Sequence, residues 1–295
     1  EAQRVSEIGL TLKRITDNFT NVQLLVTGSS SFELQSNLNE PLTGRKYEYH
    51  LYPISTAELY DSQGLLPVKQ MFESRLIYGS YPDIINHTDE AKELLMNIAN
   101  SYLYKDLLAM NEIRRPILLE KLLIALALQV SSEVSYNEVA QTIGTDNKTV
   151  EKYIDLLEKC YVIFRLNAFN RNLRTELKKS KKIYFYDNGI RNAVIQNFAP
   201  LSLRQDTGAL WENFFISERI KANHYNGNYA KSFFWRTTQQ QEIDYIEEAD
   251  GNFTAFEMKW NPNKRPITFP SPFLNNYPVK ETVVITPENY LEWVM

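Results

Sequence analysis

Apolar and polar residues alternate along two neighbouring runs, 241–249 and 252–259, near the end of the chain. Alternation with a period of two is typical of β-strands, because successive side chains point to opposite faces. Asp250 and Gly251 separate the runs, and this dipeptide favours a two-residue turn in which both residues take positive φ. The pattern therefore predicts a β-hairpin.

Counting outward from the turn predicts the facing pairs, which are Ala249 with Asn252, Ile246 with Ala255, Asp244 with Glu257, and Glu242 with Lys259. Regular alternation then places two sets of side chains on opposite faces: Glu242, Asp244, Glu257 and Lys259 on one, and Ile243, Tyr245, Phe256 and Met258 on the other. Opposed carboxylates repel. Beside an ammonium group they form a candidate site for a divalent metal, with the lysine serving the attacking water or the phosphate.

Outside the hairpin, the pattern predicts further helices and strands. Residues 1–18 are expected to be helical, and 22–27 is a nearly continuous apolar run of the kind found in buried parallel strands. Residues 68–112 repeat at helical spacing, with a break at Tyr81-Pro82. Further along, the pattern predicts helices at 190–198 and 208–223 and strands at 231–236 and 279–286.

The middle of the chain predicts three helices followed by a strand. The first covers 117–130; Ser135 opens the second with a capping box, which Gly144 ends. The third covers 147–159, with Val150, Ile154, Leu156 and Leu157 turned inward. Because a strand at 161–166 follows, this order predicts a winged helix.

Charge is distributed unevenly over this predicted winged helix. Between residues 145 and 159 three lysines, including Lys148 and Lys152, stand against four acidic residues, which is unfavourable for a helix that approaches phosphates. Between residues 165 and 182 seven basic residues and one acidic residue give a net charge of +6. Four of these, Arg171, Arg174, Lys178 and Lys179, form a candidate DNA-binding patch. A solvated loop that keeps an edge strand soluble is the equally open alternative.

Composition bounds the class of protein. The chain has 295 residues, which suggests two or three domains, and its net charge of −4 offers no global attraction to nucleic acid. The single cysteine, Cys160, rules out an internal disulfide and fits a cytoplasmic location. No apolar run reaches the length of about 18 residues that a membrane span needs, and no signal segment opens the chain.

Asp244, followed after twelve residues by Glu257-Met258-Lys259, resembles the core of PD-(D/E)xK nucleases. The resemblance implies that Asp244 and Glu257 hold Mg²⁺ and that Lys259 assists cleavage of a phosphodiester. Folds of this kind often take a further glutamate from a preceding helix, which makes Glu212 a candidate third carboxylate, with a packing role as its alternative. Ile243 stands where the family often has proline, and a solvated strand face is the alternative for the whole set.

Motifs along the whole chain are similar to AAA-type ATPases of bacteria and archaea that carry a winged helix and a nuclease-like C-terminal domain. They are Glu1-Ala2-Gln3-Arg4, Thr27-Gly28-Ser29-Ser30, Leu42-Thr43-Gly44-Arg45, Tyr78-Gly79-Ser80-Tyr81-Pro82-Asp83, Tyr186-Asp187-Asn188-Gly189, and Gly208-Ala209-Leu210-Trp211-Glu212-Asn213. The resemblance implies that Glu1 activates the hydrolytic water, that Ser29 senses the γ-phosphate, and that Arg45 reads nucleotide from a neighbouring subunit.

None of the ten glycines begins a Gly-x-x-x-x-Gly-Lys-Ser/Thr loop. Without that loop ATP lacks its phosphate cradle, so we expect ATP to act only in a longer parent protein, of which this chain is the C-terminal part. The alternative is a natural relic of an ATPase in which these residues are now structural.

We therefore predict an α/β multidomain protein in four parts: the remnant of a P-loop ATPase α/β core (1–66), a helical lid (67–112), a winged helix (113–189) and a small nuclease-like mixed α/β domain (190–295). Two hypotheses of function remain. In one the protein is ATP-regulated and acts on DNA. In the other it is a non-catalytic module that binds a protein partner or another copy of itself. Neither involves a membrane.

Overall fold

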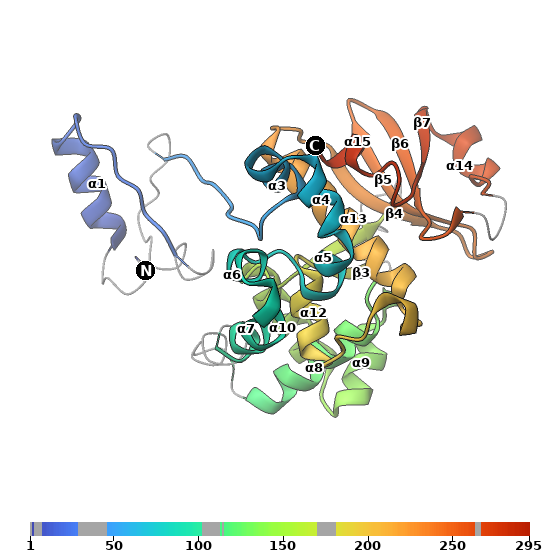
Figure 1. The fold of residues 1–295 in the computed structure, drawn as a ribbon, viewed down its shortest axis with the longest axis horizontal. Coiled ribbons are helices and arrows are strands. Elements are labelled where there is room, and N and C mark those ends of the chain that lie inside the picture. The colour runs from blue at the N-terminus through green and yellow to red at the C-terminus, as the bar shows by residue number, and fades with distance from the viewer. Residues whose placement is uncertain are drawn as a thin grey trace.

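The computed structural model describes residues 2, 8–28, 46–101, 113, 115–169, 181–262 and 267–295. Across this part of the chain it has a mixed α/β fold with thirteen α-helices and one seven-stranded sheet, in the order β1-β3-β2-β4-β5-β6-β7. Figure 1 shows helices over the first half of the chain and most of the strands towards its end. None of the described helices is long and apolar enough to cross a lipid bilayer.

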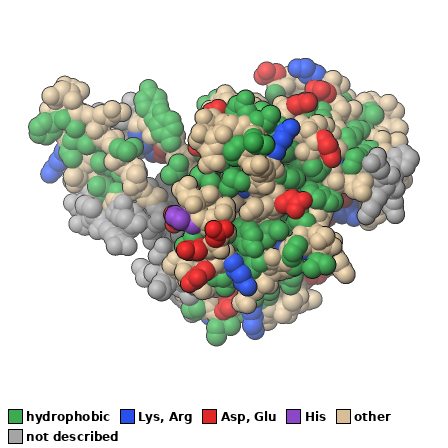
Figure 2. All heavy atoms as spheres, in the orientation of Figure 1, with side chains coloured by type: hydrophobic (Ala, Val, Ile, Leu, Met, Phe, Trp, Pro, Cys, Tyr) green, Lys and Arg blue, Asp and Glu red, His purple; other side chains and the backbone are tan. Residues whose placement is uncertain are grey.

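The N-terminal part lies apart from the rest of the molecule (Figure 1). Its helix, α1 (Ile8–Asn18), ends at the predicted residue, but the predicted buried strand at 22–27 is wrong. The segment is not a strand, and 91% of Leu25 is exposed. A buried parallel strand needs a sheet to join, and no described strand pairs with this segment. Hydrophobic side chains are accordingly visible on the surface of this part in Figure 2.

Five short α-helices follow between residues 56 and 98. Ser55 starts the first with a capping box, because its hydroxyl accepts from the Glu58 backbone while the Glu58 carboxylate accepts from Ser55. The predicted break at Tyr81-Pro82 is confirmed, since Tyr81 caps a new helix. The helices are α3 (Thr56–Gln63), α4 (Leu65–Gln70), α5 (Phe72–Tyr78), α6 (Pro82–Asn86) and α7 (Ala91–Ile98), with the 3₁₀ turn η2 (Thr88–Glu90) before the last.

The middle of the chain has the three predicted helices and the predicted strand after them, but also a short strand between the first two helices that was not predicted. Gly144 ends the second helix in a left-handed conformation, as expected, and the predicted inward residues of the third are buried. The elements are α8 (Pro116–Leu128), β1 (Glu133–Val134), α9 (Tyr136–Ile143), α10 (Asn147–Lys159), β2 (Ile163–Ala168) and β3 (Lys181–Phe185). The three strands are antiparallel, with β3 between β1 and β2.

The C-terminal part extends the same sheet. Strand β2 pairs in parallel with β4, and β6 pairs in parallel with the edge strand β7, while β4, β5 and β6 are antiparallel. The predicted boundary at residue 189 therefore falls between strands that share one sheet. The elements are α12 (Asn188–Val194), the 3₁₀ turn η4 (Leu201–Leu203), α13 (Thr207–Tyr225), β4 (Lys231–Arg236), β5 (Glu242–Ala249), β6 (Asn252–Met258), α14 (Ser271–Asn276), β7 (Val279–Ile285) and α15 (Leu291–Val294).

Candidate functional site

The hairpin of β5 and β6 has the predicted turn. Asp250 and Gly251 both have positive φ, and Ala249 pairs with Asn252. The pairing continues in the predicted register as far as Tyr245 and Phe256.

A bulge in β5 changes the open end of the hairpin. Phe233 of β4 pairs with Ile246, but Trp235 pairs with Ile243, so β5 carries one extra residue between these two pairs. The prediction that Ile243 and Tyr245 share a face is therefore wrong. Ile243 packs in one apolar cluster with Ile246 and Trp235, and Tyr245 packs in another.

The bulge turns the Asp244 carboxylate towards β6, where its Oδ2 accepts a hydrogen bond from the Met258 backbone N–H at 3.0 Å. The ammonium of Lys259 lies 2.7 Å from Glu257 Oε2 and 3.6 Å from Asp244 Oδ2. Both carboxylates are mostly buried, while 35% of the Lys259 side chain is exposed. The three residues singled out by their spacing thus meet at one point, with the lysine on the open side.

A third carboxylate arrives from helix α13. Glu212 accepts a hydrogen bond from the Tyr184 hydroxyl at 2.7 Å and lies 3.2 Å from the ammonium of Lys182. Both partners belong to β3, so the middle part of the chain contributes side chains to this site.

The predicted pair of Glu242 with Lys259 is wrong. Glu242 instead pairs with Lys182 at 2.6 Å and with Arg236 at 3.6 Å. The extra residue in β5 breaks the regular count from the turn, so pairs beyond the bulge cannot be obtained by counting.

Burial and like charge act together on two of these acids. Burial, reinforced by the charge of Asp244, raises the pKa of Glu257 to about 7 although Lys259 opposes the shift. Burial likewise raises the pKa of Glu212 to about 7, and the attraction of Lys182 offsets only part of this. Carboxyl groups with a pKa near neutrality are ready to exchange protons or to accept a cation.

The donor set suits a hard cation, because Asp244 and Glu257 direct carboxylate oxygens at one positive charge. Among the described residues no group of three or more acidic, histidine or cysteine side chains is arranged to hold a metal ion. Asp244 and Glu257 would therefore hold Mg²⁺ as two protein ligands. That number is common for Mg²⁺, which keeps several waters and often takes substrate phosphate as a ligand.

The predicted DNA-binding residues are only partly within the described structure. Lys148 and Lys152 are exposed on α10. Arg165, counted in the basic stretch, is already paired with Asp155 at 2.7 Å and with Glu158, so it is not available to phosphates. Lys182, also counted there, is buried in the candidate site. Outside the described residues lie the other DNA-binding candidates, Arg171, Arg174, Lys178 and Lys179. The nucleotide-site candidates Glu1, Ser29 and Arg45 also lie outside them.

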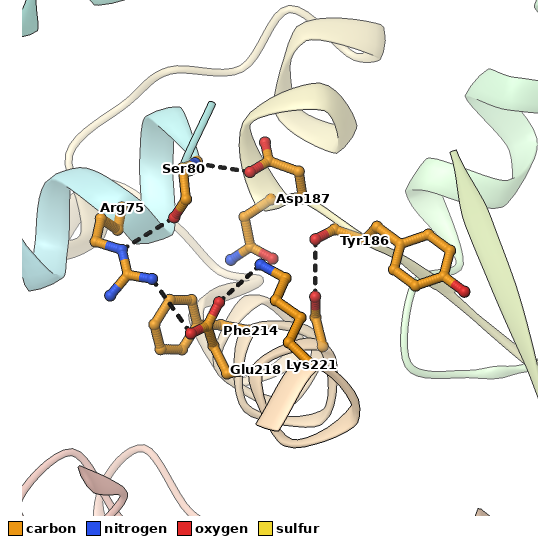
Figure 3. Close-up of a pocket in the computed structure, with 10 residues that line it drawn as sticks. Arg75, Ser80, Tyr186, Asp187, Phe214, Glu218 and Lys221 are labelled. Carbon is orange, nitrogen blue, oxygen red and sulfur yellow. Dashed lines mark hydrogen bonds and ion pairs between the residues drawn. The ribbon is translucent and has the colours of Figure 1, made fainter. Parts of the chain in front are cut away.

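A second charged cluster, the Glu218 network, was not predicted from the sequence; Figure 3 shows Glu218 with Arg75 and Lys221. Glu218 accepts hydrogen bonds from the backbone and hydroxyl of Thr56 at 2.5 and 2.6 Å, and it pairs with Lys221 at 2.8 Å and Arg75 at 3.3 Å. Arg75 also donates to the Ser80 hydroxyl. The cavity between these residues is about 10 Å³, room for one water at most. The network therefore joins segments rather than holding a ligand.

Asp187 joins two of the motifs, the one at residues 78–83 and the one at residues 186–189. Its carboxylate accepts from the backbone N–H groups of Ser80 and Ile190, which ties the loop after α5 to the start of α12. A Cβ on Gly79 would overlap this carboxylate, and one on Gly189 would overlap the Tyr78 carbonyl. Both glycines are required by close approach.

Three family models match successive parts of the chain. Residues 1–60 match an AAA domain, residues 69–201 a domain of unknown function (DUF8612), and residues 207–292 another domain of unknown function (DUF4143). No solved structure matches the chain.

Curated relatives come from bacteria and archaea. An uncharacterized protein of Haemophilus influenzae is 27% identical over 186 residues, which cover 59% of this chain and 46% of the relative. Uncharacterized proteins of Mycobacterium tuberculosis (24% identity, 88% of this chain, 57% of the relative) and Methanocaldococcus jannaschii (23%, 83% and 57%) are similar over most of it. The chain spans about half the length of these relatives. Together the matches support an AAA-type ATPase-like protein.

Proposed function

We propose that this chain is the C-terminal portion of an AAA-type ATPase that acts on DNA, and that the part after residue 190 hydrolyses phosphodiester bonds with one Mg²⁺ held by Asp244 and Glu257. The observation that carries the proposal is the convergence of Asp244, Glu257, Lys259 and Glu212 from two strands and a helix. Nucleotide binding and hydrolysis belong to the longer parent.

Each residue has a role that its surroundings support. A bound Mg²⁺ would supply Lewis-acid stabilisation of the charge that develops on the phosphate. Lys259, on the open side of the site, would hold a phosphate oxygen or the attacking water. Glu212, with a pKa of about 7, suits a general base. It would take a proton as the water oxygen bonds to phosphorus, while the bond from phosphorus to the leaving oxygen breaks and that oxygen takes a proton from solvent.

The helices α8, α9 and α10 with strands β1, β2 and β3 support a winged helix as the DNA-binding part. Its candidate phosphate contacts are Lys148, Lys152, Arg171, Arg174, Lys178 and Lys179. Changing the last four to Ala should weaken DNA binding uniformly across sequences and flatten its salt dependence by about one unit for each lost contact. Unchanged affinity and salt slope would leave these charges with a solubilising role.

The decisive experiment measures nicking of plasmid DNA with and without Mg²⁺ or Mn²⁺, beside the thermal shift that each ion causes. Ion binding to the folded state alone should raise the unfolding temperature. Asp244→Asn should abolish both the shift and the nicking, whereas Lys259→Ala should abolish nicking and keep the shift.

The competing function is a non-catalytic module that binds a protein partner or a second copy. One observation favours it: Lys259 and Lys182 already neutralise the carboxylates. This module predicts no nicking and no shift at millimolar Mn²⁺, and that result would defeat the nuclease proposal.

A further inference from the structure

Lys182 is an unusual residue in the candidate site. Only 3% of its side chain is exposed, and its ammonium lies 2.6 Å from Glu242 Oε1 and 3.2 Å from Glu212 Oε1. The ring of Phe234 lies 5.5 Å from the same nitrogen. Lysine is almost never buried unless it is paired, so this charge is held in place by the carboxylates around it.

The acidic groups keep this lysine charged. Burial alone would lower the pKa of Lys182, but the charges of Glu212, Asp244 and Glu242 outweigh it and raise the pKa above its ordinary value. The ammonium is therefore a permanent cation among three carboxylates.

The carboxylates of the site divide between two ammonium groups. Asp244 and Glu257 lie around Lys259, and Glu212 and Glu242 lie around Lys182. Their exposure differs sharply: 35% of the Lys259 side chain is exposed against 3% for Lys182. Lys259 can swing aside for an incoming ion, but Lys182 has no such room. In two-metal phosphodiesterases a second cation about 3.5 to 4 Å from the first is held by neighbouring carboxylates.

We infer that Lys182 is a built-in cation that takes the place of a second metal ion, so that the site accepts one divalent ion and not two. Lys182 is thus a positioning residue, since it holds Glu212 and Glu242 without touching substrate. The inference rests on the proposed function, and it makes a strand of the middle part of the chain, β3, a component of the site.

Isothermal titration with Mn²⁺, together with Mn²⁺ electron paramagnetic resonance, tests the inference without any activity measurement. Wild type should bind one ion per chain. Lys182→Met, which removes the charge and keeps an unbranched side chain of similar length, should bind two and show spin coupling between them. Lys182→Arg should still bind one ion, and Lys182→Met with Glu242→Gln should return to one. If Lys182→Met does not fold by circular dichroism, Lys182→Gln serves as the neutral variant.

The outcomes separate this inference from the proposed function. Two ions in wild type, or no added ion in the neutral variant, would overturn the role of Lys182 and leave the one-metal site intact. No ion in wild type would overturn the proposed function. If wild type binds no ion but the neutral variant binds one, the role of Lys182 as a built-in cation would still be supported. If neither protein binds an ion, both the proposed function and the role of Lys182 would be overturned.

Discussion

Helix α13 carries two glutamates with opposite electrostatics, Glu218 fully buried and Glu212 mostly buried. Glu218 lies among Arg75, Lys221 and Thr56, and although burial alone would raise its pKa, the charges of Lys221 and Arg75 hold the pKa down to about 2. Glu212, six residues earlier, has Lys182 as its cation, which it shares with Glu242, and the pKa of Glu212 rises to about 7.

The difference shows that burial alone does not decide what a charged residue does. Glu218 pairs with two cations, so its charge is compensated and it holds Thr56 at the start of α3. Glu212 shares Lys182 with Glu242, and the nearby charge of Asp244 adds to the effect of burial, so the charged form of Glu212 is only partly compensated. The first arrangement is suited to structure and the second to binding a cation.

Removing the Glu218 charge should have the largest effect on stability. Glu218→Gln leaves the buried charges of Arg75 and Lys221 without their carboxylate, and loss of one member of a buried ion pair costs about 3 to 5 kcal/mol. Urea unfolding at pH 7 measures the change. The matched variant is Glu212→Gln, which should not lower the free energy of unfolding at pH 7, because Lys182 keeps Glu242 and the raised pKa of Glu212 means that its charged form costs stability there. Equal losses of stability in the two variants would show that the two glutamates do not differ in their electrostatics.

Replacing Gly79, which lies beside the Glu218 network, measures how closely the chain packs against the Asp187 carboxylate. Gly79 and Gly64 both have positive φ, so alanine at either position should cost about 1 to 3 kcal/mol of backbone strain. At Gly79 the new Cβ would also overlap the Asp187 carboxylate, whereas at Gly64 it meets nothing. Thermal unfolding should therefore show that Gly79→Ala loses about 1 to 3 kcal/mol more stability than Gly64→Ala does. Equal costs would mean that Asp187 gives way easily.

The dependence of stability on pH should have opposite signs in the two regions. Between pH 4.5 and about 7 the folded state retains protons on Glu212 and Glu257 that the unfolded chain has released, so rising pH reduces the free energy of unfolding. Between about 2 and 4.5 the folded state has lost the proton of Glu218 that the unfolded chain still binds, so the stabilisation is lost as the pH falls.

Urea unfolding from pH 2 to 8 measures both slopes. Glu212→Gln should remove about 1 to 3 kcal/mol of the decline between pH 4.5 and 7, and Glu218→Gln should flatten the rise at low pH. A decline unchanged by Glu212→Gln would assign it to other groups.

The smallest expected effect is that of Asp244→Asn in the absence of metal. Because the Asp244 charge raises the pKa of Glu257, its removal should relieve repulsion and raise the free energy of unfolding by up to about 1 kcal/mol. Asparagine can still accept from the Met258 N–H. Asp206→Asn is the control. Because Asp206 pairs with both Arg191 and Arg204, the same change there should lower the free energy of unfolding. A stability loss in both variants would indicate that Asp244 acts as a paired structural acid.

Local patterns predicted local elements well. Apolar spacing and caps located α9, α10, β4 and the Asp250-Gly251 turn, because helix ends and tight turns depend on residues within a few positions of each other. The prediction of a buried strand at 22–27 was wrong because burial depends on distant residues. The apolar composition of this segment is that of a buried strand, but burial requires partners that lie elsewhere.

By itself, the sequence determined most helices and the strands β4 to β7, the hairpin register up to Tyr245, and the grouping of Asp244, Glu257 and Lys259, since each follows from neighbours along the chain. Only the tertiary structure decided that a bulge redirects Glu242, that β3 brings Lys182 and Tyr184 to Glu212, and that Glu218 joins α13 to α3. The reason is physical. Pairing between distant charges and the position of a bulge depend on how the strands and helices pack, and no local pattern records that packing.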